Sequence, residues 1–159
     1  MKYILTFFFI LFFFGGCSKE KSDQMHEIHW DRDMCELCKM VISDRGYGVQ
    51  VVNPNTGKSY MFDDLGCAII WFKENKPAWE NDAKIYIADA KTKKFIDAKK
   101  AFYDIGATTP MDYGFSAYKN KNELKYKNHL MNFKEVKLAI LRGETMQNPY
   151  IKKQLRENQ

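Results

Sequence analysis

The residues best suited to chemistry lie in one short segment, residues 33–40, which holds two cysteines and two methionines. Thiolates and thioethers are soft ligands that select Cu(I), zinc or iron–sulfur centres, and thioethers favour Cu(I) over zinc. Cys38 and Met40 are two residues apart, so on an extended strand their side chains would share one face and could meet one ion. Cys35 could complete the ligand set from the preceding loop. The segment therefore indicates a Cu(I) site at the protein surface.

The same cysteines allow other interpretations, which the sequence leaves open. Cys35 and Cys38 could form a structural disulfide, or they could be the redox pair of a thioredoxin-like thiol–disulfide oxidoreductase. A redox Cys-x-x-Cys normally opens a helix, where the helix dipole lowers the thiol pKa. Here a polar stretch precedes the pair, and the β-branched Val41 and Ile42 follow it. This context favours the metal site over the oxidoreductase.

The number of cysteines also supports a metal role. The chain has four, Cys17, Cys35, Cys38 and Cys67. If Cys17 is lipidated, three remain, and three thiols cannot all pair within one chain. Cys67 falls on the apolar side of an expected helix, where a buried, inert thiol is the preferred interpretation. A structural zinc module on Cys35, Cys38 and Cys67 stays open as an alternative, although it needs a fourth ligand.

The first 16 residues predict a lipoprotein export signal. Lys2 precedes an apolar run over residues 4–14 that is too short to span a membrane as a helix, and two glycines then lead to Cys17. This pattern resembles a bacterial lipobox, although Phe14 stands where leucine is usual. Cleavage before Cys17 would make it the lipidated N-terminus, and several acyl chains would anchor the protein stably. We therefore expect a lipid-anchored protein of the bacterial cell envelope.

The remaining chain predicts one modest domain between two polar segments. Residues 17–32 lack hydrophobic periodicity and predict a flexible tether, residues 33–143 predict the domain, and residues 144–159 predict a polar tail. The formal net charge is only +5, and the lysines are interleaved with acidic and amide residues. This distribution is typical of solvated faces and argues against a nucleic-acid partner.

Hydrophobic patterns predict an α+β fold with short antiparallel sheets. Asp63 or Asp64 can cap a helix that Pro77 ends, and Gly143 can stop a later helix. We expect these elements along the chain: a hairpin around a turn at 53–57, a helix over 65–76, strands at 84–88, within 93–105 and at 114–118, and a helix over 132–142.

Three motifs, in this order, resemble those of the NosL family. They are residues 35–40 (Cys-x-x-Cys-x-Met), residues 62–67 (Phe-Asp-Asp-Leu-Gly-Cys) and residues 109–118, which begin Thr-Pro-Met. The resemblance implies a fold of two small similar halves, each of strand–strand–helix–strand type. Lys39 departs from the family pattern, because glycine usually occupies this position in a tight local turn.

The resemblance also implies a function. NosL proteins are copper chaperone lipoproteins that face the periplasm and serve the assembly of the copper centres of nitrous oxide reductase. The family pattern implies Cu(I) ligands at Cys38 and Met40 and a third ligand at Met111, beside the Cys35 that residue chemistry suggests. We therefore expect a membrane-anchored metallochaperone rather than an enzyme. Its expected partners are an exported copper enzyme, nitrous oxide reductase above all, and a membrane transporter complex.

Overall fold

The structure, a computed structural model, describes residues 25–157 of the chain. The expected signal segment and Cys17 lie outside these residues. Among the described residues, no helix is long and apolar enough to cross a membrane. The strands are β1 (Val49–Val52), β2 (Ser59–Phe62), β3 (Lys84–Ala88), β4 (Phe95–Asp97), β5 (Phe102–Ile105) and β6 (Phe115–Tyr118). The helices are α2 (Leu65–Asn75), α3 (Phe133–Arg142) and α4 (Pro149–Glu157), with short 3-10 turns between the elements.

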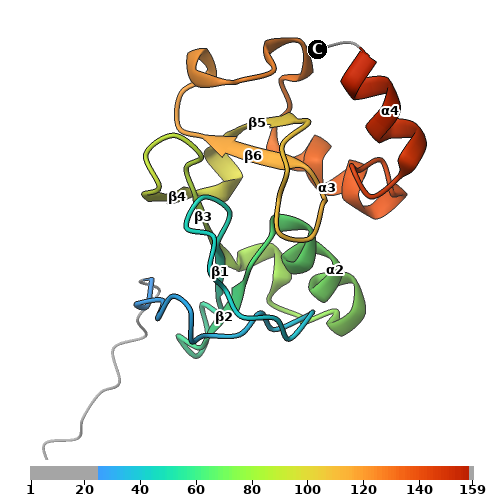
Figure 1. The fold of residues 1–159 in the computed structure, drawn as a ribbon. Coiled ribbons are helices and arrows are strands. Elements are labelled where there is room, and N and C mark those ends of the chain that lie inside the picture. The colour runs from blue at the N-terminus through green and yellow to red at the C-terminus, as the bar shows by residue number, and fades with distance from the viewer. Residues whose placement is uncertain (1–24, 158–159) are drawn as a thin grey trace, which may run out of the picture.

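The first sheet has four antiparallel strands in the order β2-β1-β3-β4 (Figure 1). Strand β1 is central, so that Val51 lies between Tyr60 of β2 and Ile85 of β3. The predicted hairpin is confirmed. The Gly57 N–H donates to the Asn53 carbonyl at 2.8 Å, and Gly57 adopts a φ of 72° that glycine permits at no steric cost.

Helix α2 packs its apolar face onto this sheet. The side chain of Asp64 accepts the Gly66 N–H at 3.1 Å and caps the first turn. The helix ends at Asn75, and Pro77 follows a left-handed Lys76. The residues predicted to share one face are all buried: Leu65, Ala68, Ile69 and Phe72. Because this face is buried against the sheet, the orientation of the first turn of α2 relative to β1 and β2 is fixed.

The other face of β1 is covered by residues 25–30, which the sequence analysis assigned to the flexible tether. Gln50 has no exposed surface, and its side-chain amide donates to the His26 carbonyl at 3.0 Å and accepts the His26 N–H at 2.7 Å. Ile28 is buried, and Trp30 stacks on Phe95 with ring centroids 6.3 Å apart. The described part of this segment therefore belongs to the folded domain.

The second sheet pairs β5 with β6 in antiparallel register. Tyr103 adds a bridge to Met131, which leads into α3. Asn132 forms a capping box at the start of α3, and Gly143 ends the helix with a φ of 74°. The helix predicted over 132–142 is therefore confirmed, as are the α+β class and the short antiparallel sheets.

The chain after α3 departs from the expected order, because a helix follows where the second half was expected to have a strand. Ile151 and Leu155 lie four residues apart and pack against the core, while the neighbouring side chains are polar. This spacing places both apolar residues on one helical face. The predicted polar tail thus contains the amphipathic helix α4.

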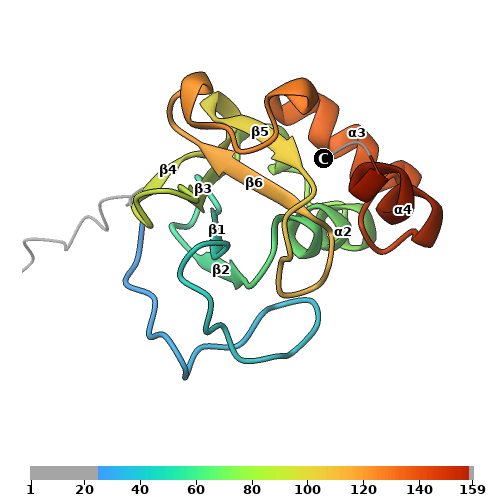
Figure 2. The same cartoon turned by 45° about the horizontal axis from the view of Figure 1, so that its top comes forward.

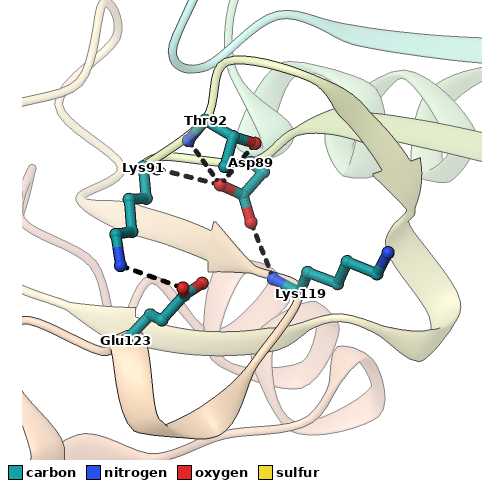
Figure 3. Close-up of polar contacts among 5 residues, drawn as sticks. All are labelled: Asp89, Lys91, Thr92, Lys119 and Glu123. Carbon is teal, nitrogen blue, oxygen red and sulfur yellow. Dashed lines mark hydrogen bonds and ion pairs between the residues drawn. The ribbon is translucent and has the colours of Figure 1, made fainter.

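A buried carboxylate ties the two sheets together (Figure 3). Asp89, at the end of β3, has no exposed surface and forms a bridge with Ala117 of β6. One oxygen of Asp89 accepts the N–H groups of Lys91 and Thr92 and the Thr92 hydroxyl at 2.7–3.0 Å, and the other accepts the Lys119 N–H at 2.8 Å. Burial by itself raises the pKa of Asp89, yet these donors hold it below its ordinary value.

One continuous hydrophobic core joins the two halves. Helices α2 and α3 pack against each other, and α3 also contacts β5 (Figure 2). The core includes aromatic side chains from both halves, among them Phe62, Phe72, Tyr103 and Phe115. Because this core is shared, the first turn of α2 and the strand ends around it are held in fixed relative positions.

Candidate metal centre

Four side chains from separate parts of the sequence converge at the start of α2. The sulfur atoms of Cys35, Cys38 and Cys67 and a carboxylate oxygen of Asp63 all lie within 4.8 Å of one another. Cys35 and Cys67 have no exposed surface, Asp63 is 2% exposed, and Cys38 is half-buried. Three thiols and one carboxylate thus form a compact set of potential ligands that solvent reaches from the side of Cys38.

The first two thiols are positioned by a closed loop before β1. Met34 and Val41 form an antiparallel bridge, and inside it the Cys35 N–H donates to the Met40 carbonyl at 2.8 Å. The Lys39 N–H donates to the Cys35 carbonyl at 3.0 Å, and Lys39 adopts a φ of 60°. The tight turn expected here therefore forms with a lysine in the left-handed region, at a conformational cost of about 1–2 kcal/mol.

Strand β2 and helix α2 supply the other two members. Asp63 directly follows β2, and Cys67 lies in the first turn of α2. The Glu36 N–H donates to the Met61 carbonyl at 2.8 Å and holds the cysteine loop against β2. The Cys38 thiol then donates to Asp63 Oδ2 at 3.4 Å, within the range of a sulfur hydrogen bond. The cluster is therefore held together by hydrogen bonds in addition to burial.

The three thiols have very different pKa values because they share hydrogen bonds. A hydrogen bond from the Cys67 thiol, opposed by burial and helped by the N–H groups of Asp63 and Cys38, lowers the pKa of Cys35 to about 6. Burial raises the pKa of Cys38 to about 12, and donation to Cys35, together with burial, raises the pKa of Cys67. The shared hydrogen bonds thus favour the thiolate form at Cys35 and the thiol form at Cys38 and Cys67, so metal binding through all three must release protons.

The carboxylate of Asp63 has an unused acceptor. Its Oδ1 is buried and has no hydrogen-bond partner among the described residues. A buried carboxylate oxygen without a donor is destabilising, and a bound cation would satisfy it. The donor set of the cluster therefore fits a metal ion, because thiolate sulfur selects a soft or borderline metal and the carboxylate adds charge.

The loop that carries Met111 lies against the same helix end. The Thr109 hydroxyl donates to Asp64 Oδ2 at 2.5 Å, and the Met111 N–H donates to the same oxygen at 3.2 Å. Tyr113 packs on the first turn of α2 so closely that a Cβ at Gly66 would lie 2.0 Å from its ring. This contact leaves room only for glycine in the family motif, and it places the Thr-Pro-Met loop beside the helix turn that bears Cys67.

The predicted ligands are therefore distributed as follows. Cys35 and Cys38 lie in the cluster. The Met40 N–H donates towards the Cys38 sulfur, while the Met40 side chain is 51% exposed. Met111 is half-buried beside α2. Coordination by Met40 and Met111 stays a prediction.

Neither Cys67 nor Asp63 was among the predicted Cu(I) ligands, and Cys67 was considered as a ligand only in the zinc alternative. Cys67 is buried as expected, but it is hydrogen-bonded to another cysteine rather than isolated in apolar surroundings. Asp63 was considered only as a helix cap, and the cap is Asp64. The motif over residues 62–67 contained both, but spacing along the chain gave no sign that they approach residues 35–38.

The fold and the site together define a small α+β protein with a thiol-rich candidate metal site. The NosL family model matches residues 27–137, and the chain belongs to the NosL family. Its fold is similar to that of the crystal structure of the copper chaperone NosL from Shewanella denitrificans, with a TM-score of 0.60 and 18% sequence identity over 71% of this chain and 95% of that chain. No curated protein has a matching sequence.

Proposed function

We propose that this protein is a Cu(I) metallochaperone that holds one copper ion at Cys35, Cys38 and Cys67. The observation that carries the proposal is the convergence of three thiols within 4.8 Å in a NosL-type fold. Cu(I) prefers soft thiolate ligands, and three sulfur atoms are enough for it. Asp63 adjoins the thiols, and its Oδ2, which accepts the Cys38 thiol at 3.4 Å, can take up the proton that Cys38 gives up on binding the metal. The similarity to a protein described as a copper chaperone supports the choice of metal.

Release of the ion follows from the unequal burial of the thiols. Cys38 is half-buried, whereas Cys35 and Cys67 are fully covered. An incoming thiolate or thioether from a partner can reach the metal beside Cys38 and form a shared intermediate. The thioethers of Met40 and Met111 are proposed to complete the site on this side, because one is exposed next to Cys38 and the other lies on the adjoining loop.

The expected recipient is an exported copper enzyme, with nitrous oxide reductase the choice that the family resemblance suggests. The lipobox-like sequence before Cys17 supports a lipid anchor and a location in the bacterial cell envelope, facing the periplasm. Metabolic labelling with a fatty-acid analogue tests the anchor, since labelling should be lost in Cys17→Ala. Labelling that persists in this variant would contradict lipidation at Cys17.

A Cu(I) titration of the reduced protein, followed by mass spectrometry under non-denaturing conditions, tests the copper site. We expect one tightly bound ion in the wild-type protein. Cys38→Ser should abolish tight binding while circular dichroism shows an unchanged fold, because Cys38 is half-buried and outside the regular elements. An unaltered Cu(I) affinity of Cys38→Ser in competition with a chelator would exclude this ligand choice.

A zinc site is the second candidate, and one observation favours it. The sequence offered three cysteines without a fourth ligand, whereas the structure places Asp63 beside them. Three thiolates and one carboxylate match the four-coordinate geometry that structural zinc adopts. A chelator that removes zinc would then unfold the protein, whereas a copper carrier should stay folded without metal. Equilibrium competition between Cu(I) and Zn(II) decides between the two.

The oxidoreductase alternative has less support from the structure. The Cys35–Cys38 segment is a turn closed by Lys39 and opens no helix, so the helix dipole that activates a redox cysteine is missing from this position. Catalytic reduction of insulin would favour the alternative. We expect no activity above that of the thiol reductant alone.

A further inference from the structure

A surface hollow of about 360 Å³ lies on the outer side of the cysteine loop. Its lining is rich in metal-ligating groups: His26, Glu27, His29, Asp33, Met34, Glu36 and Met61. Met34 and Glu36 flank Cys35, which is itself fully buried with the other thiols. The hollow and the thiol cluster therefore use different side chains of the same loop.

The segment that carries the two histidines is held in place by its backbone. Both main-chain groups of His26 bind the fully buried amide of Gln50, at 2.7 and 3.0 Å. Ile28 is buried, while the side chains of His26 and His29 are exposed. Gln50, in the valine-rich strand β1, thus holds the backbone of His26 against the domain. The two imidazoles are presented from a fixed backbone.

His29 is further positioned by a carboxylate. Asp33 Oδ2 accepts the His29 N–H at 2.8 Å and lies 3.5 Å from His29 Nδ1, and the Asp33 N–H donates back to the His29 carbonyl at 2.8 Å. Metal-binding histidines commonly give one ring nitrogen to a carboxylate, which fixes the tautomer and leaves the other nitrogen free. Contact between Asp33 and Nδ1 leaves Nε2 of His29 available in this way.

We propose that His26 and His29 form a second metal site, of imidazole type, that binds Cu(II), with Asp33 as the carboxylate that positions His29. Imidazole ligands suit Cu(II), and among divalent first-row metals Cu(II) binds such sites most tightly. The contact between His29 and Asp33 is already formed, and the site closes when the exposed imidazole of His26 turns into the hollow. The thiol cluster, in contrast, selects the soft Cu(I) ion. The protein then has separate sites for the two oxidation states of copper.

The test uses the purified protein with its thiol cluster first loaded with one equivalent of Cu(I) in the absence of oxygen. One equivalent of Cu(II) is then added, and electron paramagnetic resonance is recorded. We expect a single Cu(II) species with hyperfine coupling to imidazole nitrogen. His26→Ala and His29→Ala should each weaken Cu(II) binding at least about tenfold, in line with loss of one ligand from a small site.

His129→Ala is the matched control, since His129 lies in a distant 3-10 turn and does not line the hollow. This variant should bind Cu(II) as the wild-type protein does. Nitrogen-coupled Cu(II) retained by the His26→Ala/His29→Ala double variant would overturn the proposal. Cu(I) stoichiometry measured on the same variants separates the two sites, because the histidine variants should still bind one Cu(I) ion at the intact thiol cluster.

Discussion

Asp63 and Asp89 are both buried aspartates that directly follow a strand, but their surroundings are opposite. Asp89 receives hydrogen bonds at both oxygens from four donors, three of them backbone N–H groups. Asp63 receives one weak donor, the Cys38 thiol, at Oδ2, and its Oδ1 has no partner among the described residues. Both have almost no exposed surface. The fold therefore satisfies one carboxylate completely and leaves the other open.

This contrast distinguishes a carboxylate with a structural role from a carboxylate that could bind a metal ion. Asp89 joins the turn after β3 to the end of β6, so its hydrogen bonds stabilise the connection between the sheets. Asp63 makes no comparable connection. Its Oδ1 accepts no hydrogen bond from the described residues, which favours a role in binding an ion. Under the proposed function, the same residue type contributes to folding at one site and to metal binding at the other.

The largest expected effect is on Cu(I) affinity. It comes from substitution of Cys67, one of the two fully buried thiols beside Asp63. Cys67→Ala should weaken Cu(I) binding by more than about 100-fold, the upper end of what loss of a second-layer partner costs at metal sites. The apoprotein should stay folded, because only one sulfur atom is removed from the core. Chelator competition measures the affinity and thermal unfolding checks the fold. Unchanged affinity in a folded variant would remove Cys67 from the ligand set.

Asp89→Ala should lower the free energy of unfolding by about 2–3 kcal/mol, because three backbone N–H groups lose a charged acceptor. Denaturant titration of the apoprotein measures this loss, and Cu(I) affinity should not change. Since the pKa of Asp89 is lowered in the folded state, its stabilisation is present above the ordinary value of 3.8 and is lost as the pH falls through the folded value. Asp89→Asn should lack this part of the acid dependence; an identical acid profile would contradict the assignment.

Asp63→Asn is the matched substitution in the open carboxylate. It should leave the free energy of unfolding unchanged or slightly higher, since it removes a buried charge that lacks partners. Cu(I) binding should weaken about 10- to 100-fold, because the carboxylate that orients Cys38 and accepts its proton is lost. Denaturant titration and chelator competition on the same preparation measure both quantities. A loss of stability equal to that of Asp89→Asn would erase the distinction between the two aspartates.

The smallest effect concerns the loop that places Cys35 and Cys38. Lys39→Gly should stabilise the apoprotein by up to about 1 kcal/mol, because glycine removes the left-handed strain at this position but adds chain entropy on unfolding. Lys76→Gly is the control, since Lys76 is also left-handed, with a φ of 44°, and lies at the far end of α2. Thermal unfolding compares the two variants. Destabilisation by Lys39→Gly alone would show that the lysine side chain holds the loop.

Local signals in the sequence were enough to predict most of the elements. The aspartate cap and the proline of α2, and the terminal glycine of α3, act within a few residues of the helix ends that they determine. The hairpin turn before β2 is equally local. Each of these features depends on backbone conformations that neighbouring residues set, so the pattern alone identified them.

The candidate site needed contacts that local patterns do not contain. Cys67 has the same apolar neighbours on its helix whether it is an inert core thiol or a partner of Cys35, and only the packing of the cysteine loop on β2 distinguishes the two. Gln50 sits in a run of valines, and its burial became understandable only with His26 against it. For both Cys67 and Gln50, the environment of the side chain is determined by residues that are distant in sequence.

If the protein transfers copper as proposed, the half-buried position of Cys38 would determine the order in which bonds to the ion change. A ligand from a recipient can displace Cys38 first, while Cys35 and Cys67 still hold the ion from the protected side. Free copper would never be exposed to solvent, and the final step would depend on how strongly the recipient competes with two thiolates. The direction of transfer would then be decided by relative affinity at a single entrance, without any need for the carrier to open.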